Sequence, residues 1–264
     1  MEKIGIFDSG IGGATVFKEI IKKLPNMSYI YYSDSKNNPY GDKTKKEIEK
    51  ICEDIVEKLI KEKCTSIVIA CNTASAIAVE HLRNTYSNID ITAIEPAYKM
   101  VHDFNYNEET LVMATKGTIE SEKFNKLLHK YDNHKTELIA CTGLAELIEN
   151  DKEDEINEYL EKHLEKYKGK VKNVVLGCTH YPLIKENIRK VLENIRNKEE
   201  KEIKFFDGAE RLAENLKHKL ENKKLDNKML EIHFIDSSNN IKKEKRFFEI
   251  LNKEGNKEYE NNKK

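Results

Sequence analysis

The stretch VVLGCTHYPLI, residues 174–184, shows how this chain is organised. Four apolar or small residues lead into Cys178 and His180, and Pro182 then opens a helical pattern. An earlier stretch, IVIACNTASAIA at residues 67–78, likewise joins a β-branched run, a cysteine with polar neighbours and a helix. Strands that are apolar throughout and alternate with helices are typical of parallel sheets covered on both faces.

Nine short apolar segments predict strands, and amphipathic segments between them predict helices, for example at 44–62 and 152–168. The pattern indicates an α/β fold with mainly parallel sheet. The predicted strands are 4–7, 29–33, 66–70, 91–94, 111–114, 137–140, 173–177, 203–206 and 231–235.

An internal repeat divides the chain into two similar halves. Three pairs of strand-end residues are each separated by 107 positions, namely Asp8 and Thr115, Asp34 and Cys141, and Cys71 and Cys178. The fourth strands of the halves are 112 positions apart, which implies a small insertion. We therefore expect two similar three-layer α/β/α domains related by a pseudo-twofold axis, with the active site in the cleft between them.

The domain boundaries follow from the same repeat. The segment after 207 lies beyond the second half and most simply returns to complete the first. We expect a first domain of residues 1–97 plus 208–264 and a second of residues 98–207. The tail from about Lys253 is expected to fray.

Ligands of parallel sheets bind outside the carboxyl ends of the strands. The six repeat residues named above all occupy that edge. If the two halves face each other, Cys71 and Cys178 stand on opposite walls of one cleft.

Composition excludes several classes of function. The 264 residues carry a formal net charge of −1, which provides no electrostatic footprint for nucleic acid or an anionic membrane surface. No apolar run is long enough to span a membrane, and the first residues enter a strand rather than a signal peptide. Five cysteines form neither a disulfide framework nor a CxxC motif. We expect a cytoplasmic, reduced protein.

Two thiols facing one pocket suit the inversion of a stereocentre by proton transfer. Each precedes a helix start, where unpaired N–H groups stabilise anions, so we expect a thiolate to be accessible at both positions. One cysteine removes a proton and the other delivers one to the opposite face. Asp8 is expected to assist Cys71, and His180 to assist Cys178.

Other readings of the cysteines remain open. Cys52, Cys64 and Cys141 are interpreted as packing residues, with Cys141 alternatively a pocket wall. A zinc site of Cys71, Cys178 and His180 lacks the usual ligand spacing. A redox protein would require a disulfide between Cys71 and Cys178. A non-catalytic amino-acid-binding protein would need neither thiol.

Two loops add candidate contacts. DSGIGG, residues 8–13, does not match the dinucleotide pattern GxGxxG, and we interpret it as backbone N–H groups exposed to a small anion. NNPYGDKT, residues 37–44, is a turn that presents Tyr40 and Gly41 near the end of the second strand, or else an ordinary connection.

Five motifs together resemble glutamate racemases of the cofactor-independent aspartate/glutamate racemase superfamily. They are IGIFDSGIGGATV, NNPYGDKT, IVIACNTASA, AIEPA and LGCTHYPLI, and the resemblance covers about residues 3–210. It implies interconversion of L- and D-glutamate without pyridoxal phosphate or metal, which supplies D-glutamate for peptidoglycan. It also implies a homodimer. An aspartate or broad-specificity amino-acid racemase is the alternative.

The resemblance also implies roles for particular residues. Cys71 with Asp8 is expected to deprotonate D-glutamate, and Cys178 with His180 the L-enantiomer. Glu149 matches an acidic position near the second cysteine. The expected substrate-binding residues are Ser9, Tyr40, Gly41, Asn72, Thr73, Thr118 and Thr179.

Overall fold

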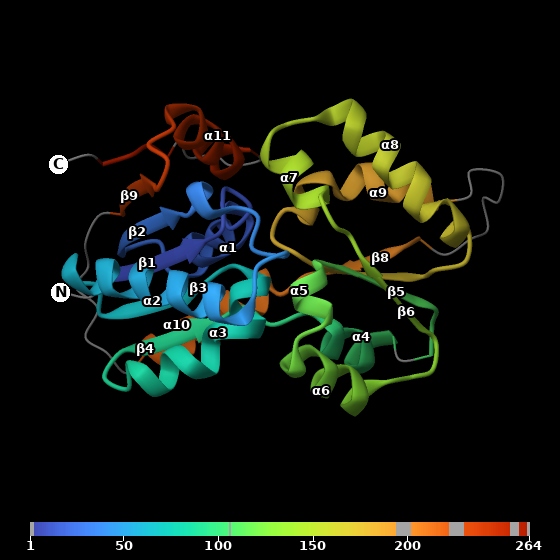
Figure 1. Cartoon of the computed structure of the whole chain (residues 1–264), viewed down its shortest axis with the longest axis horizontal. Helices are drawn as coiled ribbons and strands as arrows, with labels where there is room; N and C mark the ends of the chain where they lie inside the picture. The colour runs from blue at the N-terminus through green and yellow to red at the C-terminus, as the bar shows by residue number, and fades with distance from the viewer. Residues whose placement is uncertain (1–2, 106, 194–201, 222–229, 254–258, 263–264) are drawn as a thin grey trace.

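The computed structural model describes residues 3–105, 107–193, 202–221, 230–253 and 259–262. The described chain forms two parallel sheets, each with helices on both faces, and the sheets lie side by side along the long axis of the molecule (Figure 1). The expected α/β class and its division into two sets of elements are confirmed.

The first sheet has five strands in the order β4-β3-β1-β2-β9, all parallel to their neighbours. The last of these strands pairs with β2 and comes from the C-terminal part of the chain. The strands are β1 (Lys3–Asp8), β2 (Ser28–Ser33), β3 (Ser66–Ile69), β4 (Asp90–Ala93) and β9 (Glu231–Asp236).

The second sheet has four parallel strands in the order β6-β5-β7-β8. The equivalent strands of the two halves therefore occur in the same order, as the repeat predicts. The proposed domain boundaries remain a prediction that agrees with the return of β9 to the first sheet. The strands are β5 (Thr110–Ala114), β6 (Thr136–Ala140), β7 (Asn173–Gly177) and β8 (Lys204–Phe206).

Successive strand residues point to opposite faces, so each sheet has two apolar cores. In β1, Ile4 and Ile6 belong to one core and Phe7 to the other. The first core packs against α1 (Ala14–Lys23), α10 (Ala209–Leu220) and α11 (Ile241–Asn252), and the other against α2 (Lys45–Lys61) and α3 (Asn72–Thr85).

The second sheet is covered in the same way. Leu111 and Met113 face one core, and Val112 faces the other. The first core packs against α7 (Leu144–Glu149), α8 (Glu153–Leu164) and α9 (Lys185–Leu192), and the other against α4 (Tyr98–Asn105) and α6 (Glu122–Tyr131). A short helix, α5 (Lys116–Ile119), follows β5.

The ends of three elements differ from the predictions. The predicted helix at 44–62 is α2, which begins at Lys45 because Thr44 and Glu47 form a capping box. The predicted helix at 152–168 is α8 followed by a 3₁₀ turn, Glu165–Tyr167. Pro182 lies in a 3₁₀ turn, Tyr181–Ile184, rather than in an α-helix, and the Leu183 N–H donates to His180 O.

The expectation of a frayed tail is wrong for residues 259–262. Tyr259 packs against the core of the first sheet. The N–H of Asn262 donates to Ile232 O, and Asn261 Oδ1 accepts from the Phe234 N–H. The edge of β9 therefore gains hydrogen-bond partners from this segment, which stabilise it. The rest of the predicted tail, 254–258 and 263–264, lies outside the described residues.

Within the described part of the chain, no helix is both long enough and apolar enough to cross a membrane.

Candidate active site

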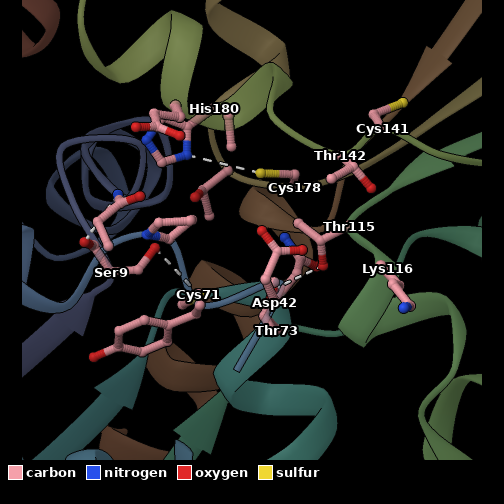
Figure 2. Close-up of a pocket in the computed structure, with 18 of the residues that line it drawn as sticks. Ser9, Asp42, Cys71, Thr73, Thr115, Lys116, Cys141, Thr142, Cys178 and His180 are labelled. Carbon is pink, nitrogen blue, oxygen red and sulfur yellow. Dashed lines mark hydrogen bonds between the residues drawn. The ribbon is translucent and has the colours of Figure 1, made fainter. Parts of the chain in front are cut away.

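Loops at the carboxyl ends of both sheets enclose one cavity (Figure 2). Its volume of about 30 Å³ leaves room for one or two water molecules. It is lined by Ser9, Asn38, Pro39, Tyr40, Gly41, Asp42, Cys71, Asn72, Thr73, Thr115, Lys116, Cys141, Thr142, Gly143, Ala145, Glu146, Cys178, Thr179 and His180.

Cys71 lies between β3 and α3, where its backbone forms the N-cap of the helix. The side chain is 4% exposed, and its Sγ lies 3.8 Å from Ser9 Oγ. Burial and the nearby Asp8 carboxylate raise the pKa of the Cys71 thiol to about 12, although the N–H of Ala74 acts in the opposite direction. The expectation of a thiolate at Cys71 is therefore wrong for this state: desolvation outweighs the helix N-terminus.

Cys178 follows β7 on the opposite wall and has a different partner. Its Sγ lies 3.7 Å from His180 Nδ1, and His180 Nε2 lies 2.7 Å from Glu149 Oε2 (Figure 2 shows the first contact). Burial disfavours a charged imidazole, but the hydrogen bonds with Cys178 and Glu149 outweigh it and raise the pKa of His180 to about 10. The three residues form a buried hydrogen-bonded chain that ends at the Cys178 sulfur in the cavity.

Asp8 is fully buried at the end of β1 and does not line the cavity. Its Oδ2 accepts from the Gly10 N–H at 3.1 Å, and its Oδ1 accepts from Thr179 Oγ1 at 3.2 Å. Burial raises the pKa of Asp8 to about 6, although the charge of His180 acts in the opposite direction. Asp8 acts on Cys71 through its charge, whereas its hydrogen bonds include those from Gly10, Gly13 and Thr179.

The glycine-rich loop after β1 is pressed against the second half of the molecule. A Cβ at Gly12 would lie 2.5 Å from His180 Nδ1, and one at Gly10 would lie 2.5 Å from Glu149 Oε2. The Ile11 N–H donates to Glu149 Oε2 at 3.0 Å. The interpretation of this loop as an anion site for a ligand is therefore wrong for Ile11, because an internal carboxylate occupies its N–H.

Three threonines join the halves at another side of the cleft. Thr73 Oγ1 on α3 lies 2.9 Å from Thr115 Oγ1, which also contacts Thr118 Oγ1 at 2.9 Å. The Gly117 N–H donates to Gly41 O, so the 37–44 loop contacts α5. Thr118 is fully buried and is not among the lining residues, so its contact with substrate stays a prediction.

Of the predicted site residues, the structure brings nine together around the cavity and places Asp8 and Thr118 behind it. Tyr40 lines the wall, but its hydroxyl donates to Asp34 Oδ2 at 2.6 Å. The nine are Ser9, Tyr40, Gly41, Asn72, Thr73, Cys71, Cys178, Thr179 and His180.

Part of the environment of His180 was not predicted from the sequence. Lys243 and Arg246 of α11 contact Glu149, and neither belongs to a motif that pointed to the site. Their signal in the sequence is weak, because two cations three positions apart on an amphipathic helix usually face solvent.

The described residues contain no group of three or more His, Cys, Asp or Glu side chains placed to hold a metal ion. All five cysteines lie in the described part of the chain and are free thiols in this structure.

The sequence matches a known protein family over most of its length. The family model for Asp/Glu/Hydantoin racemases matches residues 5–216. The chain belongs to this family. The resemblance found in the sequence is thereby confirmed, and the protein is an amino-acid racemase, an isomerase.

Individual relatives extend over most of the chain. A glutamate racemase of Clostridium botulinum is 41% identical over 226 residues, covering 84% of this chain and 85% of the relative. The crystal structure of glutamate racemase isoform RacE1 from Bacillus anthracis superposes with a TM-score of 0.81 at 29% sequence identity. The match covers 99% of this chain and 96% of that one. The crystal structure of the Francisella tularensis glutamate racemase in complex with D-glutamate superposes with a TM-score of 0.75 at 29% sequence identity. The match covers 95% of this chain and 93% of that one.

Proposed function

We propose that this family member is a glutamate racemase, which interconverts L- and D-glutamate by proton transfer at Cα between two cysteines. The observation that carries the proposal is the placement of Cys71 and Cys178 on opposite walls of one cavity, with Cys178 in contact with His180 and Cys71 within reach of the charge of Asp8. The choice of glutamate rests on the relatives, including one crystallised with D-glutamate.

The reaction needs one base and one acid at a time. From L-glutamate, the Cys178 sulfur takes the Cα proton, and the electron pair of the C–H bond moves into the adjacent carboxylate. Cys71, a thiol in this state, then delivers its proton to the opposite face of Cα, which yields D-glutamate. In the reverse direction the roles exchange, so Cys71 deprotonates D-glutamate.

The asymmetry of the two sides fits this exchange. Asp8 is near Cys71, and with a pKa of about 6 it is mostly ionised at neutral pH and can accept a proton. His180, with a pKa of about 10, is mostly protonated and can supply one on the Cys178 side. Four of the polar lining residues, Ser9, Asn72, Thr73 and Thr179, are proposed to bind the substrate's carboxylates and ammonium group.

The test is an isotope experiment in D₂O without pyridoxal phosphate. With L-glutamate, the D-glutamate formed early in the reaction should carry deuterium at Cα while the recovered L-glutamate carries little, because each enantiomer exchanges with a different thiol. Cys71→Ala and Cys178→Ala should each abolish racemisation. Cys64→Ala is the matched control, since Cys64 is buried in the α2–α3 core.

The alternatives give different results. An aspartate or broad-specificity racemase would turn over aspartate or several amino acids in a substrate panel. A binding protein would show glutamate affinity by calorimetry without isotope exchange, and the double cysteine-to-alanine variant would retain that affinity. Absence of exchange from folded, reduced protein would sink the glutamate assignment.

We further propose a homodimer that acts in the cytoplasm and supplies D-glutamate for peptidoglycan. Free thiols at all five cysteines support a reducing compartment. Light scattering of the purified protein at several concentrations tests the dimer, and depletion in a bacterium with D-glutamate added back tests the cell-wall role.

A further inference from the structure

The C-terminal helix α11 belongs to the first half of the molecule but contacts the second. It packs on α1 and follows β9 of the first sheet. Figure 1 shows α11 beside α7, the short helix of the second half that ends at Glu149. The contact lies at the carboxylate that holds His180.

Lys243 of α11 makes two hydrogen bonds with Glu149. Its Nζ lies 2.6 Å from Oε1 and 3.0 Å from the backbone O of Glu149. The lysine side chain is 14% exposed and the glutamate 4%, so solvent screens this pair little. One oxygen of the carboxylate is thus bound by Lys243, and the other remains free for His180.

Arg246 strengthens the same contact one turn further along α11. Its Nη1 donates to Glu149 O at 2.8 Å, and its Nη2 pairs with Asp151 at 2.9 Å. Carbonyl groups in the last turn of a helix lack intrahelical donors and carry partial negative charge. The two cations therefore stabilise the end of α7 as well as the Glu149 side chain.

The geometry leaves Glu149 Oε2 with two partners at the active site. It accepts from the Ile11 N–H at 3.0 Å and lies 2.7 Å from His180 Nε2. A carboxylate rotated about its side-chain torsions would lose both. We propose that Lys243 is a positioning residue of the racemase: by binding Glu149 Oε1 it holds Oε2 on His180, and so assembles the proton-transfer chain of Cys178 from both halves of the molecule.

This inference rests on the proposed function only in assigning His180 a part in the reaction. The contact itself predicts an effect on His180 with no substrate present. His180 is faced by Cys178 from its own loop, by Glu149 from α7 and by the charge of Asp8 from β1. When Glu149 turns away, His180 loses a hydrogen bond and a negative neighbour that favour its protonated form.

The experiment compares Lys243→Met with Lys243→Arg and with the control Lys245→Met. Lys245 lies on the same helix, is 80% exposed and pairs only loosely with Glu249 at 3.7 Å. His180 is titrated by ¹H–¹⁵N NMR in the substrate-free protein, with its signal assigned by its loss in His180→Gln. Rates of glutamate racemisation are measured in both directions.

Lys243→Met should lower the pKa of His180 by about one unit or more and lower kcat/KM roughly tenfold. The fall in kcat/KM should be equal in both directions, because an enzyme cannot change the equilibrium constant. Lys243→Arg should recover most of both effects, and Lys245→Met should change neither. If Lys243→Met does not fold by circular dichroism, Lys243→Gln replaces it with the same expected direction.

If the pKa of His180 is unchanged in folded Lys243→Met or Lys243→Gln, the proposal that Lys243 positions Glu149 is wrong. If Lys243→Met lowers the pKa of His180 but leaves the racemisation rate unchanged, then Lys243 has no part in the reaction and the role proposed for His180 is wrong. If the wild-type protein does not racemise glutamate but Lys243→Met still lowers the pKa of His180, the proposed function is wrong and the positioning contact stands.

Discussion

Thr179 Oγ1 donates a hydrogen bond of 3.2 Å to Asp8 Oδ1. Thr179 is the neighbour of Cys178 in the chain, and Asp8 is the carboxylate near Cys71. The two residues are 171 positions apart and belong to different halves of the chain. Both are buried, so the bond is shielded from water. The hydrogen bond thereby links the two walls of the cavity.

Thr179→Val tests that coupling. The substitution keeps the shape of the side chain but removes the donor, and it leaves a buried carboxylate with one partner fewer. We expect the free energy of unfolding to fall by about 1.5–3 kcal/mol and kcat/KM to fall as well. Urea unfolding and racemisation assays measure both. Wild-type stability in Thr179→Val would show that the bond contributes nothing.

Asp8→Asn should change how stability depends on pH. Burial raises the pKa of Asp8 from 3.8 to about 6, so the folded state holds its proton more tightly than the unfolded chain. The stability this group contributes is present below pH 3.8 and is lost as pH rises through 6.

Relative to wild type, Asp8→Asn should therefore gain up to about 3 kcal/mol in unfolding free energy between about pH 4 and about pH 7. Its racemase activity should fall roughly 100-fold. Urea titrations at the two pH values supply the comparison. A stability difference that does not vary with pH would contradict the raised pKa.

Cys71 should react slowly with iodoacetamide at neutral pH. Its thiol, with a pKa raised to about 12 by burial and by Asp8, is almost entirely protonated there. The rate should rise about tenfold per pH unit between about pH 7 and about pH 9, because only the thiolate reacts. Peptide mass mapping follows Cys71 separately from the other cysteines. A rate that is already at its plateau at pH 7 would refute this.

Gly12→Ala should disable the site without replacing an acid–base group. The new methyl would lie 2.5 Å from His180 Nδ1 and 2.7 Å from Thr179 Oγ1, too close for either side chain to stay in place. Since displacement of a catalytic group by about 1 Å costs roughly 100-fold in rate, we expect a loss of at least that size. Activity near wild type in the folded variant would mean that the loop moves freely away from His180.

Much of the architecture could be predicted from local pattern. Continuous apolar runs such as 66–70 and 173–177 marked buried parallel strands, and the spacing of Cys71 and Cys178 placed both at one edge of the sheets. The motifs that carry the resemblance also led to the nine predicted residues that line the cavity. The strands and the residues at their ends depend on the sequence of single segments, so they can be read from the local pattern of apolar and polar residues.

What the local sequence could not show depends on segments far apart in the chain. A helix N-terminus favours a thiolate at Cys71, but only the packed structure buries that sulfur beside Asp8 and raises its pKa. Asp8 and Thr118 lie behind the cavity because other side chains cover them. Glu149 meets His180, Ile11 and Lys243 only after the halves and the C-terminal helix come together. Motif and periodicity therefore predict which groups the site contains, whereas burial and long-range contacts, which arise on folding, set their protonation and their partners.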